Sequence, residues 1–115
     1  MALSTGSTLY LQGPAYGLTT STTSQNIVVA APGSSVNAIQ VENLDTTNDV
    51  FVTWSFTGAA TAVLPTSSTP QSGVAVQNGS SKVIQLSPGA AFATVCNVAA
   101  IAYAGTPAIT ITAVA

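Results

Sequence analysis

The feature that most constrains the fold of this chain is a repeated alternation of apolar and polar side chains with a period of two. Residues 50–56 read Val-Phe-Val-Thr-Trp-Ser-Phe, which places Val50, Val52 and Trp54 on one face. Residues 108–114 alternate isoleucine and threonine in a similar way. Because successive side chains of an extended strand point to opposite faces, this period predicts half-buried β-strands.

Similar short segments follow one another along most of the chain, separated by glycine, proline and asparagine. About eight or nine such segments, spaced roughly 8–12 residues apart, are typical of a sandwich or a barrel. The alanine-rich stretch 89–104 is the one candidate for a helix, but the β-branched Thr94, Val95 and Val98 favour strands there. We therefore expect an all-β fold, an antiparallel β-sandwich of jelly-roll-like form.

Two pairs of neighbouring strands are expected to form hairpins. The first spans residues 36–56, in which the turn-forming residues 44–49 separate two alternating segments. The second is centred on Asn78-Gly79, a dipeptide that suits the positive φ angles of a tight hairpin turn. Residues 57–72 are rich in small and turn-forming residues and predict a long loop, in which the apolar residues 62–64 allow one short strand.

The length of 115 residues predicts a single domain. Residues 1–25 differ in composition, because ten of them are serine or threonine. We expect an extended N-terminal arm over residues 1–25 and a β-sandwich domain over residues 26–115. The apolar residues of the arm form a candidate partner-binding patch that consists of Leu9, Tyr10, Leu11, Tyr16 and Leu18. An ordinary edge strand of the same sandwich is the alternative interpretation of this segment.

Charged residues are almost absent. The charged side chains are those of Lys82, Glu42, Asp45 and Asp49, and there is no histidine. A single lysine cannot neutralise a row of phosphates, so nucleic-acid binding is not expected. The uninterrupted apolar runs are too short to span a membrane. Without an imidazole, a serine or cysteine nucleophile lacks its usual general base, so we expect neither an enzyme nor a cofactor.

Association with other chains is favoured by this lack of charge. Exposed sheet edges are usually protected from pairing with other chains by charged residues, and Lys82 alone cannot protect every edge. We therefore expect the function to lie in assembly, with copies of the chain or with another protein lattice. Outward positions on the expected strands carry neutral polar residues, for example Thr53, Ser55, Gln77, Gln85, Thr110 and Thr112.

Two candidate sites contain ligating or reactive side chains. The first surrounds one turn and consists of Glu42, Asp45, Asn48 and Asp49. Carboxylate and amide oxygens are ligands that Ca²⁺ prefers, but aspartate and asparagine also close turns by bonding to their own backbone. The second is Cys96, whose phase with Val98 predicts a small buried hydrophobe rather than a nucleophile.

Aromatic residues suggest a third candidate site, a stacking platform for a sugar formed by Tyr10, Tyr16, Trp54 and Tyr103. Such a platform requires rings that are exposed to solvent. Trp54 is in phase with Val50 and Val52, and this position predicts a place in the core instead.

The order of several segments resembles that of the capsid decoration, or cement, proteins of tailed bacteriophages. The resemblance rests on a strand pair, a Pro-Gly turn and a terminal alternating strand, found at residues 39–43 with 50–54, at 86–89, and at 100–105 with 109–112. It implies a homo-trimer or homo-dimer on the capsid surface of the virion, where the protein bridges capsomers formed by the major capsid protein. It also implies that the arm adds a strand to that protein. A tail or head-fibre module and a carbohydrate-binding module are the alternatives.

Overall fold

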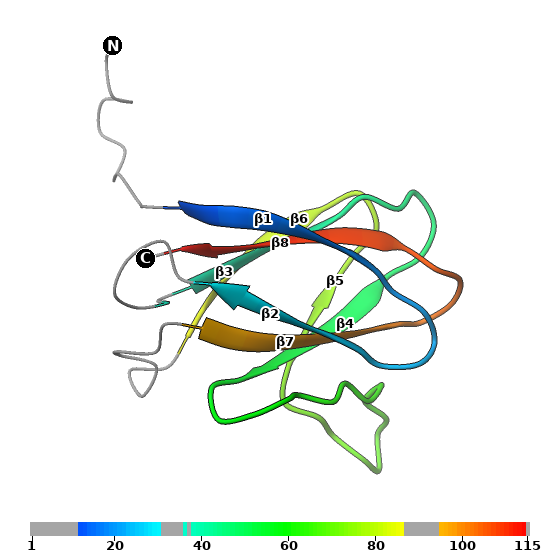
Figure 1. The fold of residues 1–115 in the computed structure, drawn as a ribbon. Helices are drawn as coiled ribbons and strands as arrows, with labels where there is room; N and C mark the ends of the chain where they lie inside the picture. The colour runs from blue at the N-terminus through cyan, green and yellow to red at the C-terminus, as the bar shows by residue number, and fades with distance from the viewer. Residues whose placement is uncertain (1–11, 31–35, 37, 87–94, 115) are drawn as a thin grey trace.

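The structure, a computed structural model, describes residues 12–30, 36, 38–86 and 95–114 (Figure 1). These residues contain strands and no helix, so the expected all-β class is confirmed. The eight strands are β1 (Gln12–Thr19), β2 (Gln25–Ala30), β3 (Ala38–Asn43), β4 (Val50–Ser55), β5 (Val74–Val76), β6 (Ser81–Gln85), β7 (Val95–Ala102) and β8 (Ala108–Val114).

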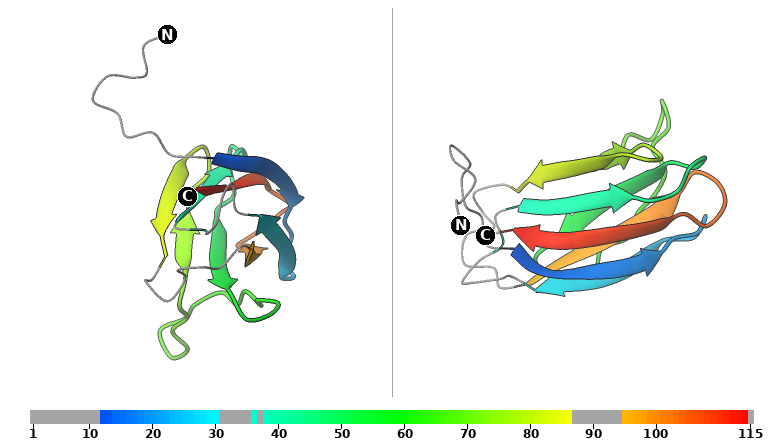
Figure 2. Two further views of the ribbon diagram at one scale, coloured as in Figure 1. Left: turned by 60° about the vertical axis from the view of Figure 1, so that its left-hand side comes forward. Right: turned by 90° about the horizontal axis from the view of Figure 1, so that it is seen from above.

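The strands form two four-stranded antiparallel sheets that lie face to face, which confirms the expected β-sandwich (Figure 2). Sheet A has the strand order β1-β8-β3-β6, and sheet B has the order β2-β7-β4-β5. β1 and β2 are therefore edge strands on one side of the sandwich, and β6 and β5 are the edge strands at the other ends of their sheets.

The pairing of the strands is nested along the chain. β1 pairs with β8, β2 with β7, β3 with β6 and β4 with β5, and all four pairs are antiparallel. Two further antiparallel pairs, β3 with β8 and β4 with β7, join these into complete sheets. Every consecutive pair of strands except β4 and β5 consequently lies in two different sheets.

The main core lies between the two sheets and is built from the inward side chains predicted by the alternation. Ile109 and Ile111 of β8 meet Val50 and Val52 of β4 there, and all four are at most 1% exposed. Burial of an aliphatic side chain of this size stabilises the fold by about 1.5–3 kcal/mol. The period-two assignment of residues 50–56 and 108–114 is therefore confirmed.

A second, smaller apolar cluster covers the outer side of sheet B. Phe51 of β4 and Ala99 and Ile101 of β7 point away from the main core and are buried against Ala62 of the connection 56–73. This connection has no strand of its own, so the long loop predicted for residues 57–72 is confirmed and the short strand that the sequence allows at residues 62–64 does not form. Because β7 is covered on both sides, its sequence is a nearly continuous apolar run rather than an alternating one.

The prediction that residues 36–56 form a hairpin is wrong, because β3 belongs to sheet A and β4 to sheet B. The chain reverses direction at residues 44–49 as expected, but it crosses the core while doing so. Two strands that face each other across a core need the same alternation as two strands that pair side by side, so the side-chain pattern does not distinguish them.

The prediction of a hairpin at Asn78-Gly79 is wrong for the same reason. The turn is present, and Gly79 has a φ of 66°, a value that glycine adopts without steric cost. However, β5 before the turn pairs with β4, whereas β6 after the turn pairs with β3 in the other sheet. The dipeptide therefore joins two sheets instead of two partners within one sheet.

For residues 12–19 the sequence allows two interpretations, an extended arm and an edge strand. In the structure these residues form the edge strand β1. The strand is antiparallel to β8, with a register shift between Gln12 and Ala15 that coincides with Pro14. The candidate arm residues Leu9, Tyr10 and Leu11 lie outside the described residues. In the part of the chain that the structure describes, no helix is long and apolar enough to cross a membrane.

Candidate interaction surfaces

The arm residues that the structure describes turn toward the inside of the sandwich. Tyr16 and Leu18 lie on β1, are half-buried, and pack against the main core. Their side chains thus contribute to the edge of the core between β1 and β2. Leu9, Tyr10 and Leu11, the other residues of the candidate patch, are outside the described residues.

Two side chains connect the sheets at the two sides of the sandwich. On one side, the Ala30 amide of β2 donates a hydrogen bond of 3.3 Å to the hydroxyl of Tyr16 on β1. On the other side, Lys82 Nζ of β6 donates a bond of 2.8 Å to the Ala75 carbonyl of β5. Each contact joins an edge strand of sheet A to an edge strand of sheet B.

The three carboxylates of the candidate calcium site point to different partners. Asp45 Oδ2 accepts bonds from the amides of Thr47 and Asn48, and Asp49 Oδ1 accepts bonds from the amide and side chain of Asn78. A third carboxylate, that of Glu42, accepts a bond from Thr110 Oγ1 on the neighbouring strand. Among the described residues, no three acidic, cysteine or histidine side chains are grouped to hold a metal ion.

Asp45 instead closes the connection between β3 and β4 as an Asx-type turn. The bonds from the Asn48 amide, at 2.7 Å, and from the Thr47 amide stabilise the ionised carboxylate. They lower the pKa of Asp45 below its ordinary value of 3.8. The turn-closing interpretation of this group of residues accordingly explains the geometry of Asp45.

The buried side chain of Asn43 links neighbouring segments at one end of the sandwich. The β1–β2, β3–β4, β5–β6 and β7–β8 connections lie at this end. Asn43 Nδ2 donates bonds to the carbonyls of Asn48 and Val76, and its Oδ1 accepts a bond from the Asp45 amide. The side chain is only 2% exposed, and these bonds satisfy it. The sequence offered one signal, a polar residue on the same face of the strand as Ile39, but it did not show the partners.

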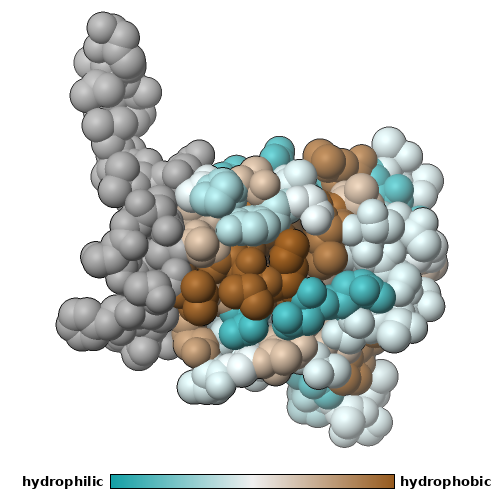
Figure 3. All heavy atoms as spheres, in the orientation of Figure 1, coloured by the Kyte–Doolittle hydropathy of each residue, from teal (hydrophilic) through white to brown (hydrophobic). Residues whose placement is uncertain are grey.

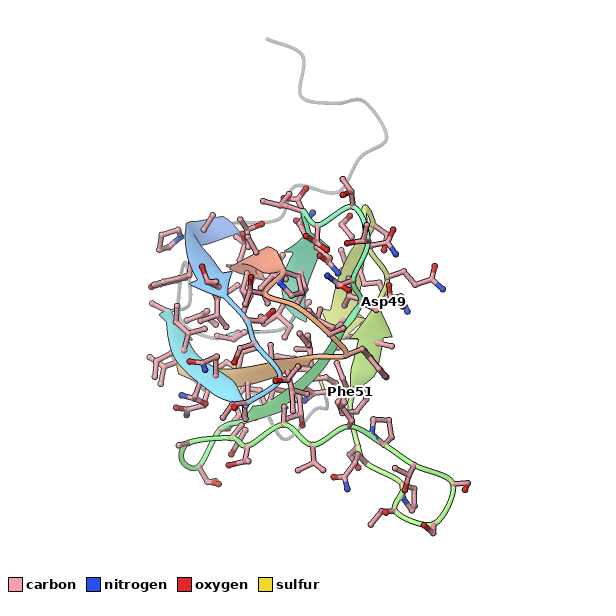
Figure 4. The ribbon with its side chains drawn as sticks, turned by 90° about the vertical axis from the view of Figure 1, so that its right-hand side faces the viewer. Asp49 and Phe51 are labelled. Carbon is pink, nitrogen blue, oxygen red and sulfur yellow. The ribbon has the colours of Figure 1, made fainter. Side chains whose placement is uncertain are left out.

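The same end, onto which Figure 4 looks, contains further contacts between connections. Thr20 Oγ1 and its amide both donate to the Pro107 carbonyl, at 2.7 and 2.9 Å, and join the β1–β2 and β7–β8 connections. The Tyr103 amide donates to the Asp49 carbonyl at 3.0 Å and joins the β3–β4 connection to them. These hydrogen bonds link three of the connections at this end of the sandwich to one another.

The aromatic residues of the candidate sugar platform do not share a face in the described structure. Tyr16 on β1 and Trp54 on β4 both pack against the main core from different sheets. Tyr103, in the β7–β8 connection, is 44% exposed. Tyr10 is outside the described residues. The prediction of a core position for Trp54 is confirmed in that its ring contacts the main core, although the residue is only half-buried.

Cys96 on β7 is fully buried in the main core and has no disulfide partner. Burial disfavours the charged thiolate and raises the pKa of this thiol to about 11. The expectation of a small buried hydrophobe is confirmed. A thiol in this environment has little nucleophilic character at neutral pH.

The outer side of sheet A is a mostly uncharged surface. Across one row the register places Ala15, Thr112, Gln40 and Val83 side by side. The next row consists of Gly17, Thr110, Glu42 and Ser81, so Glu42 contributes the single charge of the eight positions.

The surface carries few charges, because the chain has only four charged side chains, and each of them forms a hydrogen bond within the chain. An apolar patch lies over β2 and the space between β2 and β1 (Figure 3).

No family model matches this chain, and no curated protein is significantly similar to it.

Proposed function

We propose that this protein is a non-enzymatic structural protein of a virus particle, which decorates and stabilises an icosahedral phage capsid. The single observation that carries the proposal is the scarcity of charge, since the chain has only four charged side chains and each already has a hydrogen-bond partner within the chain. Lys82 bonds to a backbone carbonyl, and the three carboxylates bond to amides, an asparagine side chain or a hydroxyl. A surface with so little charge has weak electrostatic repulsion between copies and suits a crowded assembly.

The proposal includes a jelly-roll topology for the sandwich. In a jelly roll, a long antiparallel hairpin is rolled up so that its first and last strands pair and its middle strands pair. The nested pairs β1·β8, β2·β7, β3·β6 and β4·β5 support this topology. Jelly rolls are frequent in viral capsid proteins and also in lectins, so the topology by itself does not select the function.

The proposed mechanism is mechanical. Copies of the chain bind to each other and to the major capsid protein on the outer capsid surface, and bridge neighbouring capsomers. Apolar burial and neutral hydrogen bonds provide the binding energy, and symmetry repeats each contact many times around the shell. Because few ion pairs are involved, such contacts resist high salt.

The proposed contact with the capsid protein is made by the N-terminal residues, with Leu9, Tyr10 and Leu11 as the apolar anchor. This segment directly precedes β1, which is an edge strand of sheet A. Strand addition would give affinity through backbone hydrogen bonds and register through alternate side chains.

The experiment that tests the function is binding of the purified chain to icosahedral phage shells assembled without it. We expect saturable binding of hundreds of copies per shell, unchanged in molar NaCl, and a higher temperature of shell disruption. Binding of only a few copies would indicate a fibre or tail module, and no binding would overturn the proposal. A variant without residues 2–11 keeps β1 intact and tests the arm separately.

A further inference from the structure

The edges of the two sheets differ in how well they are protected against pairing with another chain. An edge strand exposes a row of unpaired backbone amides and carbonyls, which another strand can bind. Proteins usually protect such edges with charged residues, proline, a bulge or a very short strand. The part of the chain that the structure describes has four edge strands, β1, β6, β2 and β5.

Three of the four edges carry such protection. β1 contains Pro14 next to a register shift, which interrupts the regular row of backbone groups. β6 carries Lys82, the single cationic side chain of the protein. β5 is only three residues long, from Val74 to Val76, and offers few backbone groups to a partner.

β2 has none of these features. Its six residues, Gln-Asn-Ile-Val-Val-Ala, include no charge, proline or glycine, and they pair with β7 without a register shift. Val28 is 47% exposed, and Ile27 is half-buried. The apolar patch seen over this strand in Figure 3 is therefore next to a regular sheet edge.

The hydrogen bond from Ala30 to Tyr16 shows which backbone groups of β2 face this edge. The Ala30 amide bonds to Tyr16 of β1, so it points away from β7. Because successive residues of an antiparallel strand direct their backbone groups to alternate sides, the amides and carbonyls of Val28 and Asn26 also point away from β7. The groups of Val28 and Asn26 are positioned to bind an incoming strand, whereas the Ala30 amide is already bonded to the Tyr16 hydroxyl.

We propose that β2 pairs with β2 of a second copy of this chain, antiparallel and centred on Val28. This inference rests on the proposed role in assembly and names the partner of that assembly. The two sheets B would then form one continuous sheet across a two-fold axis. Two-fold contacts of this kind use the same surface on both copies.

The chemistry of β2 favours a second copy as the occupant. With Val28 opposite Val28 of the second copy, Ile27 lies opposite Val29 and Asn26 opposite Ala30. The central pairs are β-branched and apolar, and cross-strand pairs of this type are favourable. Neither β2 nor its neighbour β7 contains a charged residue, so the approach of two copies meets no repulsion from these strands.

The first test compares Val28→Lys with Val83→Lys by sedimentation equilibrium of the full chain. Val83 is 59% exposed on β6, an edge strand of the other sheet, and serves as the matched control. We expect the wild type and V83K to have twice the 11.4 kDa monomer mass, and V28K to be monomeric with an unchanged circular dichroism spectrum. A monomeric wild type at millimolar concentration, or a dimer that persists in V28K, would overturn the inference.

A second test is crosslinking, which does not depend on the effect of a new charge. Directly paired residues of antiparallel strands have Cα atoms roughly 4.5–5.5 Å apart, within the range that a disulfide spans. We expect Val28→Cys to form a disulfide-linked dimer on mild oxidation and Val83→Cys to remain uncrosslinked. No dimer from V28C would overturn the pairing. Binding of V28K to shells, measured separately, distinguishes a failure of this pairing from a failure of the decoration function.

Discussion

The Tyr16 hydroxyl on β1 of sheet A lies 3.3 Å from the Ala30 amide nitrogen on β2 of sheet B. The two residues are 14 positions apart in the chain and belong to different sheets. Among the described strands none pairs with the edge of β2 opposite β7, so this cross-sheet bond also occupies one of the backbone groups at that edge. Tyr16 therefore stabilises the fold in two ways. Its ring contacts the core, and its hydroxyl accepts the hydrogen bond from the Ala30 amide.

Replacement of Tyr16 by phenylalanine removes the hydroxyl and keeps the ring. We expect the free energy of unfolding to fall by about 0.5–1.5 kcal/mol, the usual net contribution of one hydrogen bond. Urea unfolding followed by circular dichroism measures the change. Tyr103→Phe, at an exposed ring, is the control and should change stability by less than about 0.5 kcal/mol. Equal effects of the two substitutions would show that the cross-sheet bond contributes nothing.

The Asn43 side chain should be among the most sensitive polar positions. Asn43→Ala removes three hydrogen bonds and leaves the Val76 carbonyl, which the amide had satisfied, without that donor. We expect a loss of roughly 2–4 kcal/mol in unfolding free energy, since each lost bond costs about 1 kcal/mol and burial adds to it. Asn26→Ala, at an exposed residue with one bond to the Ala60 amide, is the control and should cost about 1 kcal/mol or less.

The sequence predicted the strands well where burial determines them. Val50 and Val52 had to share a buried face because alternation is a local property, and the structure confirms it. The pairing of strands was not accessible in the same way. Turn residues at 44–49 and at Asn78-Gly79 mark a reversal of the chain, but whether the next strand pairs or crosses the core depends on distant strands, here β7 and β8.

The candidate sites show the same division between local and distant causes. The burial of Cys96 followed from its phase with Val98, and the Asx turn at Asp45 followed from its local sequence. The contacts of Asn43 with Val76 and of Tyr16 with Ala30 join segments from different strands. The unprotected edge of β2 was likewise not visible, because a strand is an edge only when its neighbours are known.

Gly105 should not tolerate a side chain. Its φ is 67°, and a Cβ atom there would lie 2.5 Å from Asn48 Nδ2. We expect Gly105→Ala to lower the unfolding free energy by at least about 1 kcal/mol, because the left-handed conformation alone costs an L-residue that amount. Gly17→Ala is the control, since nothing lies within 4 Å of the added atom. A G105A protein as stable as G17A would contradict the close contact with Asn48.

The thiol of Cys96 should be inert in the folded protein. Burial raises the pKa of Cys96 to about 11, so the reactive thiolate is scarce at pH 8, and the side chain is inaccessible. We expect negligible alkylation by iodoacetamide at pH 8 in buffer and complete alkylation in denaturant, measured by mass spectrometry. Val83→Cys, at a position that is 59% exposed and lies outside the proposed β2 contact, should gain one fast-reacting thiol under native conditions. Rapid native alkylation at Cys96 would show that the core opens at β7.

Asp45 should make the stability of the protein depend on pH in the acid range. Its pKa in the folded chain lies below the ordinary value of 3.8, so the unfolded chain binds the proton more readily. The resulting stabilisation is present above about pH 4 and disappears as the pH falls through the folded-state pKa. Asp45→Asn keeps an oxygen that accepts the Asn48 amide but carries no charge. In urea titrations we expect the wild type to be more stable than D45N at pH 7, with the difference closing toward pH 2. A difference that stays constant over this range would mean that the ionised carboxylate does not stabilise the turn.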